Sequence, residues 1–253
     1  MASDDFTWTE EAADAAGAAT RDFTVVHADG SAPGALWLPA SGSPTALILY
    51  GHGGSRHKRE ASVVAFVEAA VERHGFAVAA IDGPVHGARY SGPERTMPET
   101  QMAFRQKWDS ADSGVAGMVA DWRATLDGLL SGEALGDVKV GYFGLSMGHA
   151  YGVPLLAADA RIAAATIGLW GANYPNSEQL AAAAQNVRCP TLYMHMLADE
   201  FFTLDGALTL FDALPSDDKR LLLMPGPHAL TQEQTETGLA FLAKRLGYCQ
   251  KPA

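Results

Sequence analysis

The stretch Val138–Gly148, which reads VKVGYFGLSMG, decides how the rest of this chain is interpreted. Its first half is a short apolar run with β-branched and aromatic residues, which is typical of a buried strand. Its second half, Gly144-Leu145-Ser146-Met147-Gly148, is a G-x-S-x-G pentapeptide, and a helix-compatible stretch follows over His149–Ala160. In such a strand–turn–helix unit the two glycines let the backbone turn sharply and present the serine hydroxyl at the turn. The pattern predicts that Ser146 is a nucleophile.

The composition narrows the class of protein. The chain has 253 residues, 48% of them hydrophobic and 19% charged, which predicts a folded globular protein with either one large α/β domain or two small ones. A formal net charge of −11 argues against nucleic acid or an anionic membrane surface as a partner. The two cysteines, Cys189 and Cys249, have no C-x-x-C spacing, so we expect neither a disulfide framework nor a zinc site. Because no apolar run reaches the roughly 18 residues of a membrane span and the acidic N-terminus lacks the features of a secretion signal, we expect a cytoplasmic protein.

Strand-like and helix-like segments alternate along the chain, which predicts a mostly parallel sheet of eight strands with helices on both faces. The expected strands are Phe23–His27, Ala35–Leu38, Thr45–Tyr50, Phe76–Ile81, the run before Ser146, Ala163–Leu169, Cys189–Leu197 and Arg220–Met224. The first two form an antiparallel hairpin at one edge of the sheet. The expected helices are Glu60–His74, Ser110–Leu130, a helix from about Gly148, Glu178–Gln185, Leu204–Leu214 and Gln232–Leu246.

We expect a single domain over residues 22–253, preceded by residues 1–21 as a short helix or a loose lead-in. One segment inside the domain breaks the alternation. Val85–Asp109 contains glycine, proline, arginine and aromatic residues and has no steady period. A long irregular connection of this kind usually carries function or covers a site, and this segment is therefore the candidate for any lid.

A serine nucleophile needs a base and an acid, and both are expected later in the chain. The histidines after Ser146 are His149, His195 and His228. The first lies in the helix that follows the serine and the second lies inside a strand. His228 follows the last strand, where a loop can bring its imidazole over the strand ends, so we expect it to be the base.

The acid is expected at Asp199, which directly follows the strand Cys189–Leu197 and therefore lies at the same edge of the sheet. Its role is to fix the tautomer of the imidazole and to stabilise the imidazolium that forms during attack. Glu200, the next residue, and Asp205 remain alternatives for this role. Either of them also follows the strand closely enough to reach the same loop.

Acyl transfer develops negative charge on an oxygen, and fixed backbone N–H groups stabilise that charge. One donor is expected from Met147, the residue after the nucleophile. The other is expected from the loop after the strand Thr45–Tyr50, which reads His52-Gly53-Gly54. Because glycine lets the backbone approach a substrate closely, Gly54 is the expected donor and Gly53 the second choice.

With these motifs in this order, the sequence resembles the serine hydrolases of the α/β-hydrolase superfamily. The resemblance covers the chain from about residue 22 and is carried by His52-Gly53-Gly54-Ser55, Phe143–Gly148 and Leu197-Ala198-Asp199. The hairpin and the compact length are similar to the dienelactone-hydrolase-like and small bacterial esterase branch. Dienelactone hydrolases carry a cysteine nucleophile, however, where this chain has Ser146, which favours ordinary esters.

The resemblance implies an α/β-hydrolase fold with a small lid or none, no cofactor, and a small-molecule ester as substrate. It implies hydrolysis of carboxylic esters with small to medium acyl groups through a Ser-His-Asp acyl-enzyme mechanism. Two alternatives stay open. The same triad also serves thioesterases and amide or C–C bond hydrolases, and the same scaffold also occurs in non-catalytic ligand-binding proteins.

The substrate pocket is expected at the carboxyl ends of the strands. Several segments with aromatic residues reach this edge, including those with Tyr174 and Phe202. The candidates to line the pocket are Tyr90, Trp108, Trp170 and Phe201. A group of basic residues also reaches this edge, and we interpret the group as solvated loop charge in preference to an anion site: Arg56, Lys58, Arg59, Arg89, Arg95 and Arg105. The spacing of His52, His57 and His86 does not match a metal-binding helix face, so no metal site is expected.

Overall fold

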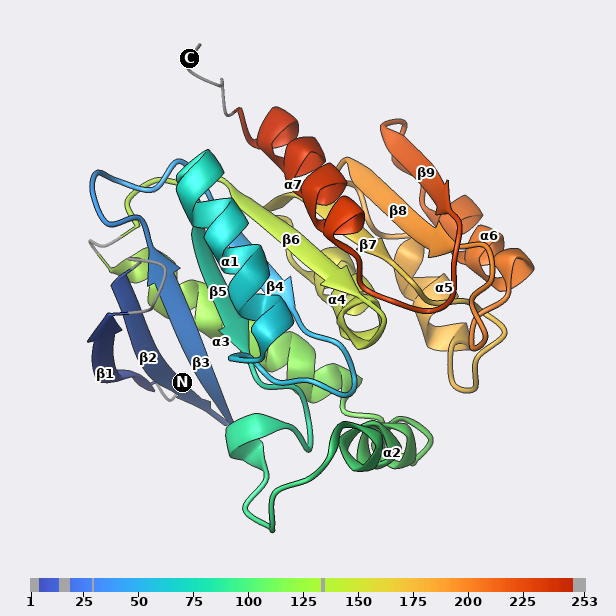
Figure 1. Cartoon of the computed structure of the whole chain (residues 1–253), viewed down its shortest axis with the longest axis horizontal. Helices are drawn as coiled ribbons and strands as arrows, with labels where there is room; N and C mark the ends of the chain where they lie inside the picture. The colour runs from blue at the N-terminus through green and yellow to red at the C-terminus, as the bar shows by residue number, and fades with distance from the viewer. Residues whose placement is uncertain (1–4, 14–18, 29, 133–134, 248–253) are drawn as a thin grey trace.

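The computed structural model describes residues 5–13, 19–28, 30–132 and 135–247. Its strands form one sheet in the order β1-β2-β3-β5-β4-β6-β7-β8-β9 (Figure 1). Strands β1, β2, β3 and β5 pair antiparallel, and every other pair from β5 to β9 is parallel. The strands are β1 (Asp5–Ala13), β2 (Ala19–His27), β3 (Gly30–Leu38), β4 (Leu47–Gly51), β5 (Ala77–Ile81), β6 (Val140–Leu145), β7 (Ile162–Gly168), β8 (Thr191–Met196) and β9 (Lys219–Met224).

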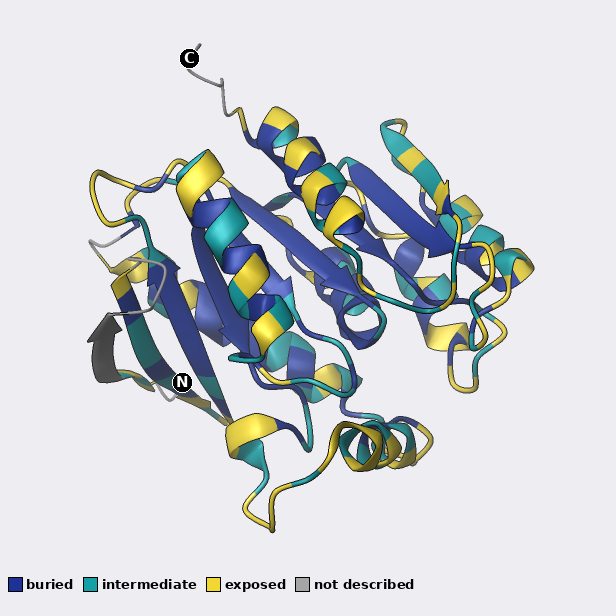
Figure 2. Cartoon of the chain, in the orientation of Figure 1, coloured by how far each residue is buried: buried dark blue, intermediate teal, exposed yellow. Residues whose placement is uncertain are grey.

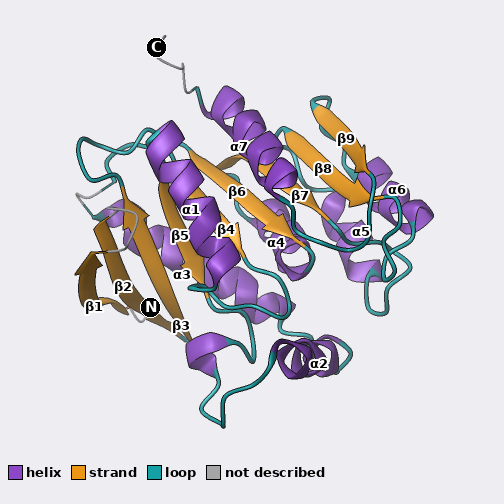
Figure 3. Cartoon of the chain, viewed as in Figure 1, coloured by secondary structure: helices purple, strands orange, loops and turns teal. Residues whose placement is uncertain are grey.

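Helices cover both faces of this sheet (Figure 3). Helices α1 and α7 lie on one face, and α3, α4, α5 and α6 lie on the other (Figure 1). Helix α2 lies beyond the end of the sheet. The helices are α1 (Ala61–His74), α2 (Met97–Trp108), α3 (Val115–Ser131), α4 (Met147–Ala158), α5 (Glu178–Ala184), α6 (Leu204–Ala213) and α7 (Gln232–Leu246).

The sheet divides the apolar interior into two layers, one on each face. Every residue of β5 and β6 is buried, as expected for central parallel strands that are covered on both sides (Figure 2). The layer under α1 and α7 contains Phe66 and Leu242, whereas the layer under α3 and α4 contains Trp122 and Tyr151. The mostly parallel α/β architecture predicted from the sequence is confirmed.

The sheet has nine strands in the described residues where the sequence led us to expect eight. All eight expected strands are present, and the ninth is β1, which lies where a short helix or a loose lead-in was expected. That expectation was wrong for residues 5–13. Asp5 and Thr7 are exposed and Phe6 and Trp8 are half-buried, and this alternation is the period of a strand. The domain boundaries, 1–21 and 22–253, stay a prediction.

The segment Val85–Asp109, expected to be irregular, contains the short 3₁₀ turn Gly87–Arg89 and the twelve-residue helix α2. Helix α2 was not predicted because it has no continuous apolar stripe, and only Phe104 and Trp108 are buried along it. The start of the helix, however, has the sequence features of a helix N-terminus. The carboxylate of Glu99 accepts the backbone N–H of Thr96 at 2.8 Å, and Pro98 stands in the first turn, as in many helix N-termini.

The parallel strands bring distant parts of the chain to one edge. Ser146 follows β6, Asp199 lies three residues after the end of β8, and His228 lies four residues after the end of β9. The loop Gly51–Ser55, at the end of β4, reaches the same edge because β4 and β6 are neighbours in parallel register. Among the described residues, no helix combines the length and the apolar character that crossing a membrane requires.

Candidate active site

The candidate nucleophile Ser146 stands on a strained turn between β6 and α4. Its φ of 58° and ψ of −122° are rarely adopted by residues with a side chain. The turn is possible because its glycines allow close packing: a Cβ on Gly148 would lie 2.2 Å from the carbonyl oxygen of Gly51. The N–H of Ser146 donates to the carbonyl of Gly168 at 2.9 Å, which ties the turn to the neighbouring strand. The predicted strand–turn–helix unit is therefore present.

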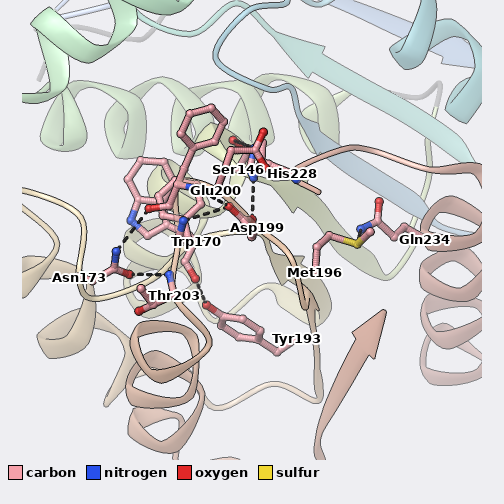
Figure 4. A network of polar contacts seen from close by, with 12 residues as sticks. Ser146, Trp170, Asn173, Tyr193, Met196, Asp199, Glu200, Thr203, His228 and Gln234 are labelled. Atoms are coloured by element: carbon pink, nitrogen blue, oxygen red, sulfur yellow. Dashed lines mark hydrogen bonds and ion pairs between the residues drawn. The ribbon is translucent and has the colours of Figure 1, made fainter. Parts of the chain in front are cut away.

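The side chains of Ser146, His228 and Asp199 form a continuous chain of hydrogen bonds (Figure 4). The Nε2 atom of His228 lies 3.0 Å from the Oγ of Ser146, and its Nδ1 lies 2.8 Å from Oδ2 of Asp199. The side chain of Asp199 is fully buried. An imidazole bound to a carboxylate at Nδ1 presents the Nε2 lone pair to the hydroxyl, which is the tautomer that a general base requires.

Asp199 is itself held in place by the backbone. Its Oδ1 accepts the N–H groups of Phe201 at 2.9 Å and Phe202 at 3.0 Å. Burial raises the pKa of this carboxyl, but hydrogen bonds from His228 and from the two N–H groups outweigh burial and leave the pKa below its ordinary value. Asp199 therefore stays ionised beside the imidazole at neutral pH.

Glu200 and Asp205, the alternatives to Asp199 in the sequence analysis, make no side-chain hydrogen bond to the imidazole of His228 among the described residues. The carboxylate of Glu200 accepts the backbone N–H of His228 at 2.8 Å, so it holds the loop and not the ring (Figure 4). Asp205 lies in the first turn of α6. Of the three acids, Asp199 is the one in contact with the imidazole of His228.

The loop Gly51–Ser55, called the oxyanion loop below, borders the same cavity as the serine. Gly53 and Gly54 line this cavity together with Ser146 and His228. Gly54 is packed tightly, because a Cβ there would lie 2.7 Å from Cδ1 of Phe104. Met147 is the first residue of α4, where backbone N–H groups have no partner within the helix. Both segments expected to supply oxyanion donors thus flank Ser146.

The cavity has a volume of about 310 Å³ and one aromatic wall. Trp170 and Phe201, two of the four aromatic residues predicted to contact substrate, line it. Trp108 does not: it is fully buried behind Trp170, with ring centroids 5.2 Å apart, and its Nε1 donates to the carbonyl of Pro175. Tyr90 is also outside the cavity, where the guanidinium of Arg95 lies 3.4 Å from its ring centroid.

Sequence reasoning did not single out Gln101 and Phe104 on α2, which also line the cavity. Arg105, expected at this edge as solvated loop charge, lines it as well, as do Tyr174 and Phe202, which lie on segments expected to reach this edge. Recognising the start of α2 at Thr96 and Glu99 would have placed residues 101, 104 and 105 on one helix, the first and last of them one turn apart. The rings of Tyr174 and Phe202 both pack against Trp170.

The basic residues near this edge mostly have acidic partners. Lys58 pairs with Asp82 at 2.6 Å, and Arg59 and Arg89 pair with Asp22 and Asp121. Arg56, which pairs with Glu60, and Arg105 are the two that line the cavity.

The histidines near this edge form no metal site with neighbouring ligands in the described part of the chain. Within the ranges that the structure describes, no group of three or more His, Cys, Asp or Glu residues could hold a metal ion. His52 and His86 are instead bonded to backbone groups of the surrounding loops.

Known proteins resemble this chain in structure. No protein-family model and no curated protein matches it. The PEG-bound structure of a cold-adapted esterase from an Arctic intertidal metagenomic library is 34% identical, with a TM-score of 0.83, and the match covers 95% of this chain and 99% of that chain. The zinc-bound structure with the same source description is 31% identical, with a TM-score of 0.76 and the same coverage.

A more distant structure shares the fold. Acetyl xylan esterase from Paenibacillus sp. R4 is 16% identical, with a TM-score of 0.69, and the match covers 96% of this chain and 89% of that one. The sheet, the strained serine turn and 34% identity over nearly the whole length lead to one assignment. The chain belongs to the esterases of the α/β-hydrolase superfamily.

Proposed function

We propose that this protein hydrolyses carboxylic esters with small to medium acyl groups, and that Ser146, His228 and Asp199 carry out the reaction. The observation that carries the proposal is the unbroken contact chain from the Oγ of Ser146 through the imidazole to a buried, ionised carboxylate. A structural serine has no need of such a chain, nor of a strained backbone that projects its hydroxyl into a cavity.

The reaction proceeds in two halves. As the Oγ of Ser146 attacks the acyl carbon, Nε2 of His228 takes the hydroxyl proton and the carbonyl oxygen becomes an oxyanion. When the tetrahedral intermediate collapses, His228 returns that proton to the leaving alcohol, and the acyl group stays on Ser146. Water then attacks the acyl-enzyme with the same base, which releases the carboxylic acid and restores the serine.

Charge stabilisation completes the mechanism. The imidazolium that forms in each half lies against the carboxylate of Asp199, which neutralises it. The oxyanion is assigned to the N–H groups of Gly54 and Met147 on the two sides of Ser146. A donor of this kind contributes about 3–4 kcal/mol to transition-state stabilisation.

The cavity sets the substrate class. Its volume of about 310 Å³ suits an acyl chain of a few carbons, and its aromatic wall of Phe104, Trp170, Phe201 and Phe202 favours an apolar group.

We also propose a cytoplasmic location. The free thiol of Cys189, whose pKa burial raises to about 11, is compatible with a reducing compartment.

The direct test compares the wild type with Ser146→Ala on p-nitrophenyl acetate, butyrate and octanoate. We expect the variant to lose activity by about 10⁴-fold or more, because the nucleophile is removed while the fold is kept. Ser131→Ala, at an exposed serine at the end of α3, is the matched control and should behave as wild type. Equal activity in the wild type and Ser146→Ala would overturn the mechanism.

The same assay separates the enzyme alternatives. An acyl thioester and p-nitroacetanilide, run beside p-nitrophenyl acetate, measure the preference for sulfur, nitrogen or oxygen leaving groups. A kcat/KM highest for the oxygen ester supports the proposal. Wild-type protein that hydrolyses none of them, and whose Ser146 does not react with a fluorophosphonate probe, would instead be a ligand-binding protein on this scaffold.

A further inference from the structure

Two buried histidines, His52 within the oxyanion loop and His86 beside it, have no part in the mechanism above. His52 and His86 are 2% and 0% exposed, and their ring centroids lie 5.1 Å apart in an edge-to-face arrangement. We propose that His86 is a positioning residue that, together with His52, clamps the peptide planes on both sides of Gly54 and so aims the Gly54 N–H at the oxyanion. This inference rests on the proposed function.

Each histidine holds one carbonyl of the loop. The Nδ1 of His52 lies 2.9 Å from the carbonyl oxygen of Gly53, and the Nε2 of His86 lies 2.9 Å from that of Gly54. These two carbonyls belong to the peptide units that precede and follow the Cα of Gly54. Holding both units fixes the φ and ψ angles of Gly54, the two soft dihedrals of that residue.

The direction of the clamp is toward the cavity. In a planar trans peptide, the carbonyl of Gly53 and the N–H of Gly54 point in opposite directions. His52 attracts that carbonyl from a position outside the cavity, whereas Gly53 and Gly54 both line the cavity. The N–H of Gly54 is therefore turned away from His52 and toward the side where Ser146 lies.

The loop needs such a clamp because of its composition. Two successive glycines have the widest range of backbone conformations, and a rotated peptide would present a carbonyl where the oxyanion requires an N–H. The chain has no freedom to stiffen Gly54 with a side chain, since a Cβ there would collide with Phe104 at 2.7 Å. Hydrogen bonds from the side chains of His52, within the loop, and His86, outside it, supply rigidity, in addition to the N–H of Arg56, which donates to the carbonyl of Gly53 at 3.1 Å.

His86 is directed at Gly54 by a strained turn after β5. Val85 has a φ of 62°, a left-handed conformation that is unfavourable for a β-branched residue, and Gly87 has a φ of 48°. A Cβ on Gly87 would lie 2.3 Å from Oδ1 of Asp82. Strain of this size, of order 1–3 kcal/mol, persists only where surrounding contacts impose it, and it occurs mainly at functional sites.

A buried ion pair holds this turn in place. The carboxylate of Asp82 accepts the Nζ of Lys58 at 2.6 Å, the backbone N–H of Lys58 at 3.0 Å and that of Ala88 at 2.9 Å. Asp82 therefore joins the turn that carries His86 to the segment just after the oxyanion loop. The two turns are joined again where the N–H of Gly83 donates to Nε2 of His52 at 2.9 Å.

The protonation of both rings suits this role. Because Nε2 of His52 accepts from Gly83, its proton is on Nδ1 and is donated to the carbonyl of Gly53. Burial, with the neighbouring His86, lowers the pKa of His52 to about 3, and burial also lowers the pKa of His86. Both ring nitrogens of His86 face carbonyl oxygens, Pro84 O at Nδ1 and Gly54 O at Nε2, and a neutral ring can donate to only one of them. The clamp requires the tautomer with the proton on Nε2, which donates to Gly54.

The two ring nitrogens give a matched test. In His86→Gln, the amide nitrogen replaces Nε2 and still reaches Gly54, whereas in His86→Asn the amide replaces only Nδ1. We expect His86→Asn to lower kcat on p-nitrophenyl butyrate about 10- to 100-fold and to leave KM within about 3-fold of wild type. The reason is that the N–H of Gly54, which this variant no longer holds in place, binds the oxyanion only in the transition state. His86→Gln should recover most of the loss.

The order should reverse at His52, where Nδ1 makes the contact with the loop. There His52→Asn keeps the donation to Gly53 and should be more active than His52→Gln. A second readout is the Ki of an alkyl trifluoromethyl ketone, which forms an oxyanion on Ser146 and should bind more weakly in proportion to the loss in kcat. His149→Asn, at a buried histidine whose ring packs on Tyr193, controls for the loss of a buried imidazole and should keep wild-type kcat.

The outcomes distinguish this inference from the proposed function. An inactive wild type, or an active Ser146→Ala, would contradict the proposed function itself. An active wild type whose folded His86→Asn matches it in kcat and in Ki would overturn the clamp alone. The clamp would also be overturned if the Asn and Gln variants were equally impaired at both His86 and His52. In that case the size of the side chain would matter and not the position of its hydrogen-bonding nitrogen. If His86→Asn does not fold, the order of the two His52 variants decides.

Discussion

At the scale of single residues, Asp199 couples the chemistry to the fold. One carboxylate oxygen holds the imidazole and the other is held by two backbone N–H groups, so the side chain cannot rotate without losing several contacts. The same contacts keep the pKa of Asp199 below its ordinary value against the opposing effect of burial. The orientation of His228 therefore depends on a residue that never touches the substrate.

We predict that Asp199→Asn lowers kcat about 10³- to 10⁴-fold while the protein stays folded. The amide replaces the carboxylate at Nδ1, favours the wrong imidazole tautomer and no longer stabilises the imidazolium. Steady-state kinetics on p-nitrophenyl butyrate measures the effect. Asp205→Asn, the same change in the first turn of α6, should stay within about 2-fold of wild type. A similar loss in both variants would indicate that Asp199 has no special role.

A second residue-scale prediction concerns acid stability. His149 is buried in α4, has no hydrogen-bond partner on either ring nitrogen, and burial lowers its pKa to about 3. Between about pH 6.5 and pH 3 the unfolded chain binds a proton at His149 that the folded protein does not bind, so the free energy of unfolding falls as pH falls. At pH 5 this one group costs about 2 kcal/mol relative to neutral pH.

His149→Leu removes that cost. Urea unfolding at pH 7.5 and pH 5 should show that the variant loses about 2 kcal/mol less stability than the wild type on acidification. Leu156→Ala provides the control, because it removes a buried side chain of the same helix that has no titratable group, and it should lower the stability by the same amount at both pH values. Parallel losses in the wild type and His149→Leu would contradict the prediction.

At the scale of elements, α2 decides the shape of the site. It brings Gln101, Phe104 and Arg105 to the cavity. Its last residue, Trp108, is hydrogen-bonded to the loop after β7 through both its side chain and its backbone carbonyl. Trp108 Nε1 donates to Pro175 at 2.7 Å and Asn176 donates to the carbonyl of Trp108 at 2.8 Å. The segment named from the sequence as the candidate for any small lid thus contains a short helix that is anchored beside the aromatic wall.

We predict that Phe104→Ala extends the acyl range. Phe104 is buried against Gly54, and its removal enlarges the apolar end of the cavity. The ratio of kcat/KM for p-nitrophenyl octanoate to that for the butyrate should rise about 10-fold, the effect of about 1–2 kcal/mol of added apolar contact. Met102→Ala, at an exposed position of the same helix, is the control. An unchanged ratio would show that the acyl chain lies elsewhere.

At the scale of the whole molecule, the active site and the N-terminal strand lie at different places on one sheet. Strand β1 forms one edge of the sheet. Four strands separate it from β6, the strand that leads into Ser146. Phe6 on β1 stacks on Phe23 with centroids 4.9 Å apart and packs against α3, where a Cβ on Gly128 would lie 2.0 Å from its ring. This edge contributes to stability at a distance from the chemistry.

We predict that Phe6→Ala lowers the free energy of unfolding by about 2 kcal/mol and leaves kcat/KM within about 2-fold of wild type. The loss reflects a half-buried aromatic ring, so it lies below the 3–5 kcal/mol of a fully buried one. Denaturant unfolding and p-nitrophenyl butyrate hydrolysis measure the two effects. Thr7→Ala, on the exposed face of the same strand, should change neither. A large loss of activity in Phe6→Ala would mean that the edge is coupled to the site.

The sequence alone determined the parts of this protein that depend on local geometry. A G-x-S-x-G turn needs its glycines wherever it occurs, and apolar runs followed by helical periods predict a parallel sheet, so Ser146 and eight strands were predictable. His228 and Asp199 could be proposed because residues that follow parallel strands meet at one edge of the sheet.

Tertiary structure decided what depends on contacts between distant segments. Sequence order left Glu200 and Asp205 as alternatives to Asp199, and only the packed loops show which carboxylate meets the imidazole. The place of Phe104 in the aromatic wall was equally hidden, as was the contact of His86 with Gly54, 32 residues away. Hydrogen bonds and close packing act over a few ångströms, and which side chains come that close is set by the whole fold and not by neighbours in the chain.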